Sequence, residues 1–354
     1  ADTEAEDYWL DEFSTIPPVL DFPADHPRPK MRSFESKLVE VRIRPDQLDR
    51  LKTLATATNA SLFNVLLSGW FAFTARLSGH NDLVVGIPTA GQVASGMPNL
   101  VGHCVNLLPL RVNIDVHESF ETLVATVKDK LTDGLDHQGY TFGRLLKRLP
   151  IPRDASRLPI VSVQFNLDPP ADSSDHDFGS ATPGISTNPR SFENFELFIN
   201  IAEDQAGLLV LLQYNSNLFE QDSMRNRIQE YFALLDAACD APGTPTAELN
   251  LLTGRDLEQI QQYSHGPEGL EHERHFLQLF ADQVVAAPDA TAVIGDDKTL
   301  SYAELDAEST RQATRLAALL SEPSEALIGI ALPRNADMLA SLLAVWKTGA
   351  AYVP

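Results

Sequence analysis

The first 250 residues alternate between stretches with the two-residue period of a strand and stretches with the period of a helix. Residues 36–44 carry Val39 and Val41 on one side and charged residues on the other, which predicts a strand. Pro45 suits the first turn of a helix, and leucines recur at helical spacing after it. A second amphipathic helix is predicted from Ser61, whose side chain can cap it.

The same periods continue along the rest of this region. Strands are predicted at 82–88, 159–168, 195–204 and 207–215, and helices at 118–135 and 221–239. Only a few turn-forming residues separate the last two strands, which therefore predict a hairpin. Strands and amphipathic helices in mixed order indicate an α/β fold or an α+β sandwich up to about residue 250.

Two segments of this region lack either period. Residues 17–29 hold too many prolines for a helix or a central strand, so we expect an extended arm along a surface. Residues 168–190 are rich in Asp, Ser, Pro and Gly and have almost no apolar side chains, which predicts a mobile loop.

The pattern changes from about residue 275. Helices are predicted at 275–286, 301–320 and 336–347, the first with Phe276, Leu279, Phe280 and Val284 facing inward. A short strand, "ALIGIAL", precedes the third helix, and "GAAYVP" begins another strand after it. A strand, a helix and a new strand form the start of a parallel, doubly wound sheet. The new strand has no later partner in the sequence, so we expect the chain to be a piece of a longer protein.

Charge and cysteine content narrow the class of protein. The 354 residues include 27 basic and 49 acidic side chains, and the net charge of −22 argues against nucleic acid as a partner. Cys104 and Cys239 are too few for a disulfide framework. The acidic N-terminus does not resemble a signal peptide, and no apolar run reaches the roughly 18 residues of a membrane span. We therefore expect a cytoplasmic protein with no membrane partner.

The stretch "LVGHCVNLLPLR" at residues 100–111 sets His103 beside Cys104 in an apolar run. Such a run predicts a buried strand, in which neighbouring side chains point to opposite faces. A cysteine–histidine nucleophile pair needs hydrogen-bond contact, so this geometry favours a packed Cys104 and a satisfied or pocket-lining His103.

Other chemical motifs are weak. The sequence contains no Gly-x-Ser-x-Gly elbow and no Gly-x-Gly-x-x-Gly fingerprint, and in "GQVASGM" Met97 stands where a phosphate-binding lysine belongs. His272 and His275 have a spacing that suits metal ligands, but solvated histidines are the better interpretation. Asp296 and Asp297 lie in an evident turn. We expect no metal or cofactor site in this chain.

The order of several segments resembles the condensation domains of nonribosomal peptide synthetases. "LVGHCVNLLPLR" resembles the fifth core motif of that family through Gly102, Asn106 and Arg111. "HQGYTF" at 137–142 is similar to the sixth motif, and "RDASRLPI" at 153–160 closely matches the seventh. "YWLDEF" and the proline-rich arm look like the segment that follows the fourth motif.

The C-terminal part resembles the beginning of an adenylation domain. "LSYAEL" at 300–305 and "WKTGAAYVP" at 346–354 are similar to the first and second core motifs of that family. The resemblance implies the second lobe of a condensation domain at 1–251, a linker at 252–274 and the N-terminal fragment of an adenylation domain at 275–354.

The resemblance also implies a fold and a reaction. Condensation domains have two chloramphenicol-acetyltransferase-like lobes, with a tunnel in which two carrier-bound phosphopantetheine arms meet. The family joins a donor thioester to an acceptor amine with the help of a His-His-x-x-x-Asp-Gly motif. No two histidines are adjacent in this sequence, so the resemblance places the catalytic motif upstream and no catalytic residue in this chain. Its partners would be the donor and acceptor peptidyl carrier proteins and other domains of the same synthetase.

Some positions depart from the family pattern. Gly139, Thr141 and Gly143 replace the usual residues of the sixth motif, and His103 stands where an aromatic residue is common. The adenylation part stops before the phosphate loop and the catalytic lysine of that family. ATP and Mg²⁺ would therefore belong to the complete adenylation domain of the parent, and we expect this chain alone to be inactive.

The candidate tunnel or lobe-interface residues are His103, Asn106, Arg111, Arg153, Asp154 and Arg157. Two roles are open for Asn106. It could make a hydrogen bond across the lobe junction or to substrate, or it could only satisfy the backbone of a strand. We expect Arg157 to form a structural ion pair, for which Asp154 is the nearest carboxylate in sequence. Arg111 and Arg153 are candidates for a phosphopantetheine phosphate, although a paired or solvated arginine is more common. Lys347 is expected to sit at a helix end.

Three alternatives remain open at this level. An epimerisation domain shares much of this lobe, but an adenylation domain directly downstream favours condensation. A heterocyclising relative differs upstream, although "RDASRLPI" favours condensation over it. The lobe is also compatible with a non-catalytic module that only binds carrier proteins.

Overall fold

The computed structural model divides the chain into two compact units, residues 1–263 and residues 264–354. The structure describes residues 3–94, 96–97, 99–152, 154–168, 190–204, 207–266, 275–295, 298–321 and 325–354. The predicted loop at 168–190 falls almost entirely outside these residues, as do Arg153, His272, Asp296 and Asp297.

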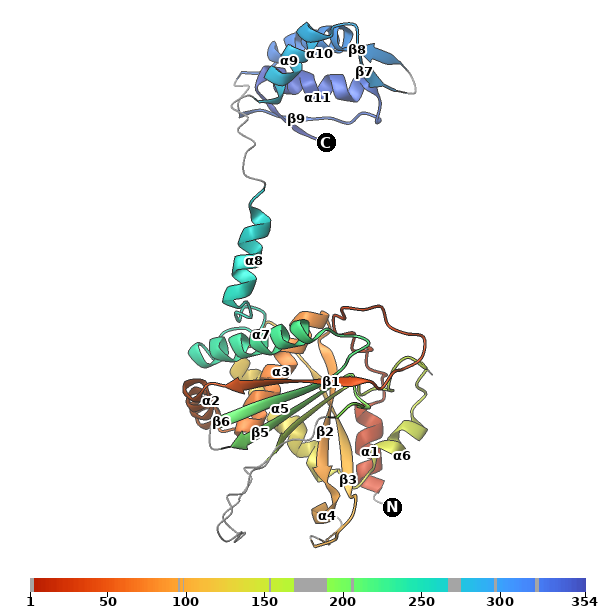
Figure 1. Ribbon diagram of the computed structural model, residues 1–354, viewed down its shortest axis with the longest axis vertical. Helices are drawn as coiled ribbons and strands as arrows, with labels where there is room; N and C mark the ends of the chain where they lie inside the picture. Colours follow the sequence, from red (N-terminus) through yellow and green to blue (C-terminus); the bar gives the residue numbers. More distant parts are fainter. Residues whose placement is uncertain are drawn as a thin grey trace. The chain divides into compact units, whose positions relative to one another are not determined.

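The described part of the first unit contains one six-stranded mixed sheet, ordered β1-β6-β5-β4-β2-β3 (Figure 1). Its strands are β1 (Ser36–Ile43), β2 (Asp82–Ala90), β3 (Val105–Asn113), β4 (Val163–Asp168), β5 (Leu197–Asp204) and β6 (Gly207–Asn215). The pairs β2/β4 and β4/β5 are parallel, and the other neighbours are antiparallel. The predicted hairpin is confirmed, because Asp204 pairs with Gly207 at the β5/β6 turn.

The helices of this unit are α1 (Thr3–Glu12), α2 (Pro45–Ala57), α3 (Leu62–Ser78), α4 (Gly91–Ala94), α5 (Phe120–Asp136), α6 (Phe142–Arg148), α7 (Gln221–Asp240) and α8 (Gly254–Ser264). The four helices predicted in this unit, now α2, α3, α5 and α7, begin close to the predicted residues, whereas α1, α4, α6 and α8 were not predicted. Pro45 opens α2 as predicted, and Ser61 caps α3 by accepting a hydrogen bond from the Asn64 N–H at 3.1 Å. The segment predicted as a linker contains α8, none of whose side chains is buried.

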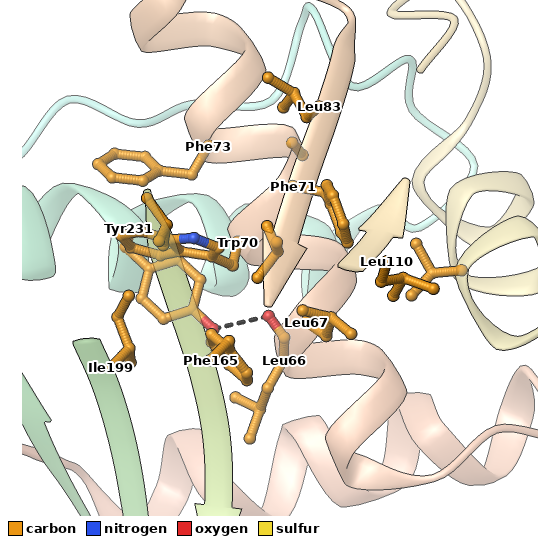
Figure 2. Packing of buried hydrophobic residues seen from close by; sticks show 14 of the residues in the cluster. Leu66, Leu67, Trp70, Phe71, Phe73, Leu83, Leu110, Phe165, Ile199 and Tyr231 are labelled. Atoms are coloured by element: carbon orange, nitrogen blue, oxygen red, sulfur yellow. Dashed lines mark hydrogen bonds between the residues drawn. The ribbon is translucent and has the colours of Figure 1, made fainter. Parts of the chain in front are cut away.

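The core of the first unit lies between helices and sheet. Trp70 and Phe73 of α3 pack against Tyr231 of α7, with ring centroids 5.5 and 6.0 Å away, and Figure 2 shows this group from nearby. The buried Tyr231 hydroxyl donates to the Leu66 carbonyl at 2.8 Å, which satisfies a polar group that burial would otherwise penalise. The arm adds Phe22 to the same cluster, so it does more than lie along a surface.

The second unit has a separate, smaller core. Its elements are α9 (Phe276–Ala286), β7 (Thr291–Ile294), β8 (Thr299–Ser301), α10 (Tyr302–Ala317), β9 (Leu327–Gly329), α11 (Ala336–Thr348) and β10 (Ala351–Val353). Strands β9 and β10 are parallel with α11 between them, which confirms the predicted strand–helix–strand order. On α9, Phe280 is buried, but Phe276 and Leu279 are 54% and 38% exposed, so the predicted inward face was too wide.

Among the described residues, no single helix has the length and hydropathy of a membrane span. Helices α2 and α3 meet such a criterion only as a pair, bent by 101° at their junction.

Candidate functional site

The fifth-motif segment is a strand only in its second half. Strand β3 begins at Val105, and His103 and Cys104 precede it in an irregular segment where Val101 is 97% exposed. The prediction of a buried strand from residue 100 was therefore wrong for its first five residues, and the opposite-face argument does not apply to His103 and Cys104. His103 itself is exposed to solvent.

This irregular segment is tied to the end of β2 by backbone. The Gly91 N–H donates to the Cys104 carbonyl at 2.9 Å. A Cβ atom at position 91 would lie 2.3 Å from that carbonyl oxygen, so only glycine allows this approach. The contact lies one residue beyond the last β2/β3 pair, Ala90 with Val105.

Asn106 links the fifth motif to the sixth. Its side-chain Nδ2 donates to the backbone carbonyl of Gln138 at 3.0 Å. Of the two interpretations that the sequence left open, a bond to backbone is the one present among the described residues, although the carbonyl lies beyond the end of α5 rather than in the strand.

Arg111 is fully engaged within the first unit. Its guanidinium holds both carboxylate oxygens of Asp82, at 2.9 and 2.7 Å, across the β2/β3 pair. The remaining N–H groups donate to the Glu12 carbonyl at 2.7 Å, the Thr15 carbonyl at 2.8 Å and the Thr15 hydroxyl at 3.0 Å. These five bonds use all five donors of the guanidinium.

The environment of Arg111 stabilises its charge. The hydrogen bonds to Asp82 raise its pKa above the ordinary arginine value despite partial burial. The guanidinium also lies 5.6 Å from the centre of the Phe13 ring, just after α1, which lies beside β3 in Figure 1. Arg111 therefore fastens α1 to the edge strand and has no donor left for a phosphate.

The seventh motif folds into a tight turn. Asp154 accepts from the Ser156 N–H at 2.8 Å and from its hydroxyl at 2.6 Å, and these bonds lower the pKa of the Asp154 carboxyl. Four residues further on, Ile160 has φ 64° and the Val161 N–H donates to the Pro159 carbonyl at 2.7 Å. This is a γ-turn, which is strained for a β-branched residue.

Arg157 binds the proline-rich arm. Its Nη2 lies 2.9 Å from the Asp21 carboxylate and its Nη1 3.3 Å from the Leu20 carbonyl, whereas its Nε is 3.7 Å from Asp154. The predicted structural ion pair exists, but its nearest partner is Asp21 rather than the sequence neighbour Asp154.

Sequence reasoning missed the residues that complete this network. Arg28 of the arm makes two hydrogen bonds to Glu196, at 2.6 and 2.9 Å, and these side chains are only 17% and 11% exposed. Arg28 also lies 3.7 Å from Asp21. The clue in the sequence was the presence of charged residues between the prolines of the arm, but no periodic pattern connects them to a partner.

The sixth motif packs against α1. The His137 ring stacks on Tyr8 with centroids 4.1 Å apart, the Trp9 indole N–H donates to the His137 carbonyl, and the Tyr140 hydroxyl donates to Glu6 at 3.3 Å. Thr141 occupies the N-cap of α6 without a side-chain capping bond.

The described residues offer no set of metal ligands. His275 is the exposed N-cap of α9, and its predicted companion His272 lies outside the described residues. Lys347 does more than occupy a helix end, because its ammonium donates to Asp306, Ser309 and Thr310 of α10 at 2.7 to 2.8 Å.

Two protein-family models match the chain in succession. The condensation domain model matches residues 2–261, and the AMP-binding enzyme model matches residues 280–354. Among curated proteins, surfactin synthase subunit 1 of Bacillus subtilis is 31% identical over 98% of this chain and gramicidin S synthase 2 of Brevibacillus brevis is 30% identical over 98%. The chain spans about a tenth of the length of these relatives, 10% and 8% respectively.

Solved structures of nonribosomal peptide synthetases are also similar to this chain. A four-domain nonribosomal peptide synthetase, holo-AB3403 bound to AMP and glycine, superposes with a TM-score of 0.74 at 25% identity, over 100% of this chain and 28% of that one. The first condensation domain of the CDA synthetase superposes with a TM-score of 0.56 at 23% identity, over 71% of this chain and 53% of that one, which shows the shared fold. With a family model covering most of its length, the chain belongs to the condensation-domain family of nonribosomal peptide synthetases and continues into the start of an AMP-binding domain.

Proposed function

We propose that this chain is part of a module that forms an amide bond between two carrier-tethered groups, a donor acyl or peptidyl thioester and an acceptor aminoacyl thioester. The observation that carries the proposal is the succession of a condensation domain and an AMP-binding domain in one chain. An adenylating domain supplies an activated acid, which a condensation domain in the same module can use.

The role of this lobe is to position reactants rather than to transfer protons. Asn106, Arg111 and Arg157 all bind groups of the first unit, so each acts on the shape of the lobe. No two histidines are adjacent in the sequence, so the paired histidines of the family motif would come from the lobe that precedes this one. Catalysis would then depend on orientation between two lobes.

The proposed partners follow from this reaction. Peptidyl carrier proteins would present both substrates on phosphopantetheine arms, and other domains of the synthetase would load them in the cytoplasm. ATP and Mg²⁺ would act in the complete AMP-binding domain. We expect the 354-residue chain alone to give neither amide product nor ATP–pyrophosphate exchange.

The test compares this chain with a complete module, which contains in addition the preceding lobe, expected to have roughly 150 to 200 residues, and the whole AMP-binding domain. Loaded donor and acceptor carriers are mixed with each protein, and the thioester products are identified by mass spectrometry. The proposal expects a dipeptidyl thioester from the module and none from the chain. A product that has lost a further water would indicate heterocyclisation, and carrier binding without product would indicate a binding module; either result would overturn the proposal.

A further inference from the structure

Three polar side chains meet on strands β4 and β5 in a part of the sheet that the known motifs do not include. Asn166 and Asp168 lie two residues apart on β4, and Asn200 of β5 is the register partner of Asn166. We call these three residues the Asn–Asp–Asn array.

The array lies on the face of the sheet opposite helix α3. The Phe165 ring contacts Phe63 and Trp70 of α3, with centroids 5.9 and 6.4 Å away. Successive strand side chains point to opposite faces, so Asn166 and Asp168 point away from that core. All three side chains of the array are half-buried there.

Apolar residues adjoin the array on this second face, together with Gln164 of β4 and Gln213 of β6. In the sheet register, Asn200 lies beside Leu211 and Asp168 beside Ala202, which in turn lies beside Leu209. Phe198 is the next residue on the same face of β5. A few placed polar groups within an apolar surface are typical of ligand sites.

The hydrogen bonds within the array fix which polar atoms remain. Asn166 Nδ2 donates to Asp168 Oδ1 and to Asn200 Oδ1, both at 2.8 Å, and Asn200 Nδ2 donates to Asp168 Oδ2 at 2.8 Å. Both N–H groups of the Asn166 amide are therefore used. Flipping this amide would place its Oδ1 against the Asp168 and Asn200 oxygens, so the orientation is fixed. Among the bonds to described residues, Asn166 Oδ1 accepts none and one Asn200 N–H is unused, while Asn200 Oδ1 and each Asp168 oxygen accept one bond and keep a second acceptor site.

The open Asn166 Oδ1 beside the open Asn200 N–H matches a secondary amide, which offers one N–H and one carbonyl. We propose that the Asn–Asp–Asn array binds a secondary amide of the carrier-tethered chain, an inference that rests on the proposed function. Asn166 Oδ1 accepts from the ligand N–H, Asn200 donates to the ligand carbonyl, and Asp168 holds both amides in place. Such amides occur in a peptidyl group and in pantetheine, so the acyl chain and its tether are two sources of the same chemistry.

Side-chain NMR of the 354-residue chain tests the proposal directly. The probes are N-acetylalanine methylamide for the acyl chain and pantetheine for the tether, each paired with an analogue in which ester oxygen replaces the amide N–H. We expect at least one amide probe to shift the side-chain NH₂ signals of Asn166 and Asn200 in a saturable way. Its ester analogue should bind about fivefold more weakly, because one hydrogen bond is lost.

Two variants sharpen this comparison. Asn166→Ala should remove the preference for amide over ester, whereas Gln164→Ala, two residues earlier on the same face of β4, should retain it. Equal shifts with amide and ester, or no shift with any probe, would refute the array even if the variants failed to fold. The NMR measurement does not depend on condensation, so a negative result would leave the proposed function untouched. Equally, a module that forms no amide product would not change the NMR result.

Discussion

Arg111 shows how one side chain can join three segments. Its sequence context, at the end of the fifth motif, made a phosphate contact conceivable. Its five donors instead reach the Asp82 carboxylate, the last residue of α1 and the residue Thr15. An arginine suits this role because its donors form a rigid planar fork, which a lysine cannot reproduce.

Replacing Arg111 should therefore destabilise the first unit. Arg111→Ala leaves the Asp82 carboxylate, which is 25% exposed, and two carbonyls without their donor, so we expect a loss of about 2 to 3 kcal/mol in the free energy of unfolding. Arg111→Lys should destabilise the unit almost as much as Arg111→Ala. Urea denaturation followed by circular dichroism measures the change.

The matched control is Arg225→Ala, which removes an exposed arginine of α7. Its effect should stay within about 0.5 kcal/mol. If Arg111→Ala were as mild as this control, the contacts of Arg111 would contribute little to stability.

At the scale of elements, two helical glycines occupy opposite environments. A Cβ atom on Gly69 of α3 would lie 2.4 Å from Leu235 Cδ2, and Leu235 is fully buried against α3. A Cβ atom on Gly134 of α5 would lie 3.5 Å from the Trp9 ring, an ordinary contact. Helix α3 thus needs glycine for its packing against α7, and α5 does not.

Alanine at these positions should have opposite effects on stability. In a helix, alanine gains about 1 kcal/mol over glycine, but overpacking typically costs about 1 to 3 kcal/mol. We expect Gly69→Ala to lower the thermal midpoint of the first unit and Gly134→Ala to raise it, as measured by differential scanning calorimetry. A rise with Gly69→Ala would show that Leu235 can move aside without cost.

Local periodicity predicted the elements well where one face is buried. The N-cap of α3 and the β5/β6 hairpin follow from residues adjacent in sequence. The prediction for the first half of the fifth motif was wrong, because the apolar Val101 suggested burial whereas its side chain is exposed. An apolar residue is buried only where another element packs against it, and composition does not indicate whether such an element is present.

The candidate site was less predictable than the elements. Asp154 is three residues from Arg157 and was the natural partner in sequence, yet Asp21, 136 residues away, is closer. Likewise, the partner of Asn106 is a backbone carbonyl, which any residue carries. Long-range pairs of this kind depend on the folded path of the chain, and no local pattern records them.

At the scale of the whole molecule, each unit has its own hydrophobic cluster. Trp70 and its neighbours form the first, and Phe280, Leu305, Ala340 and Leu343 form the second. The first is far larger, and larger buried areas give greater stability. Two separate cores predict two unfolding transitions rather than one.

Tryptophan fluorescence can follow these transitions separately. Of the three tryptophans, Trp9 and Trp70 belong to the first unit and Trp346 to the second. We expect Lys347→Met, which removes the bonds to α10, to lower the free energy of unfolding of the second unit by about 1 kcal/mol or more, so that only the Trp346 transition moves to lower denaturant. Arg111→Ala should move only the transition that Trp9 and Trp70 report. A common shift of both signals by either variant would contradict independent unfolding.

The contact between the arm and the seventh motif also has a consequence for protein engineering. Asp21 lies within hydrogen-bond reach of Arg157, and the Arg32 N–H donates to the Ala155 carbonyl at 2.8 Å. A hybrid synthetase that takes the arm from one parent and the seventh motif from another would combine two halves of one ion-pair network. Recombination sites between them should therefore preserve Asp21 together with Arg157, and Arg28 together with Glu196, as inherited pairs.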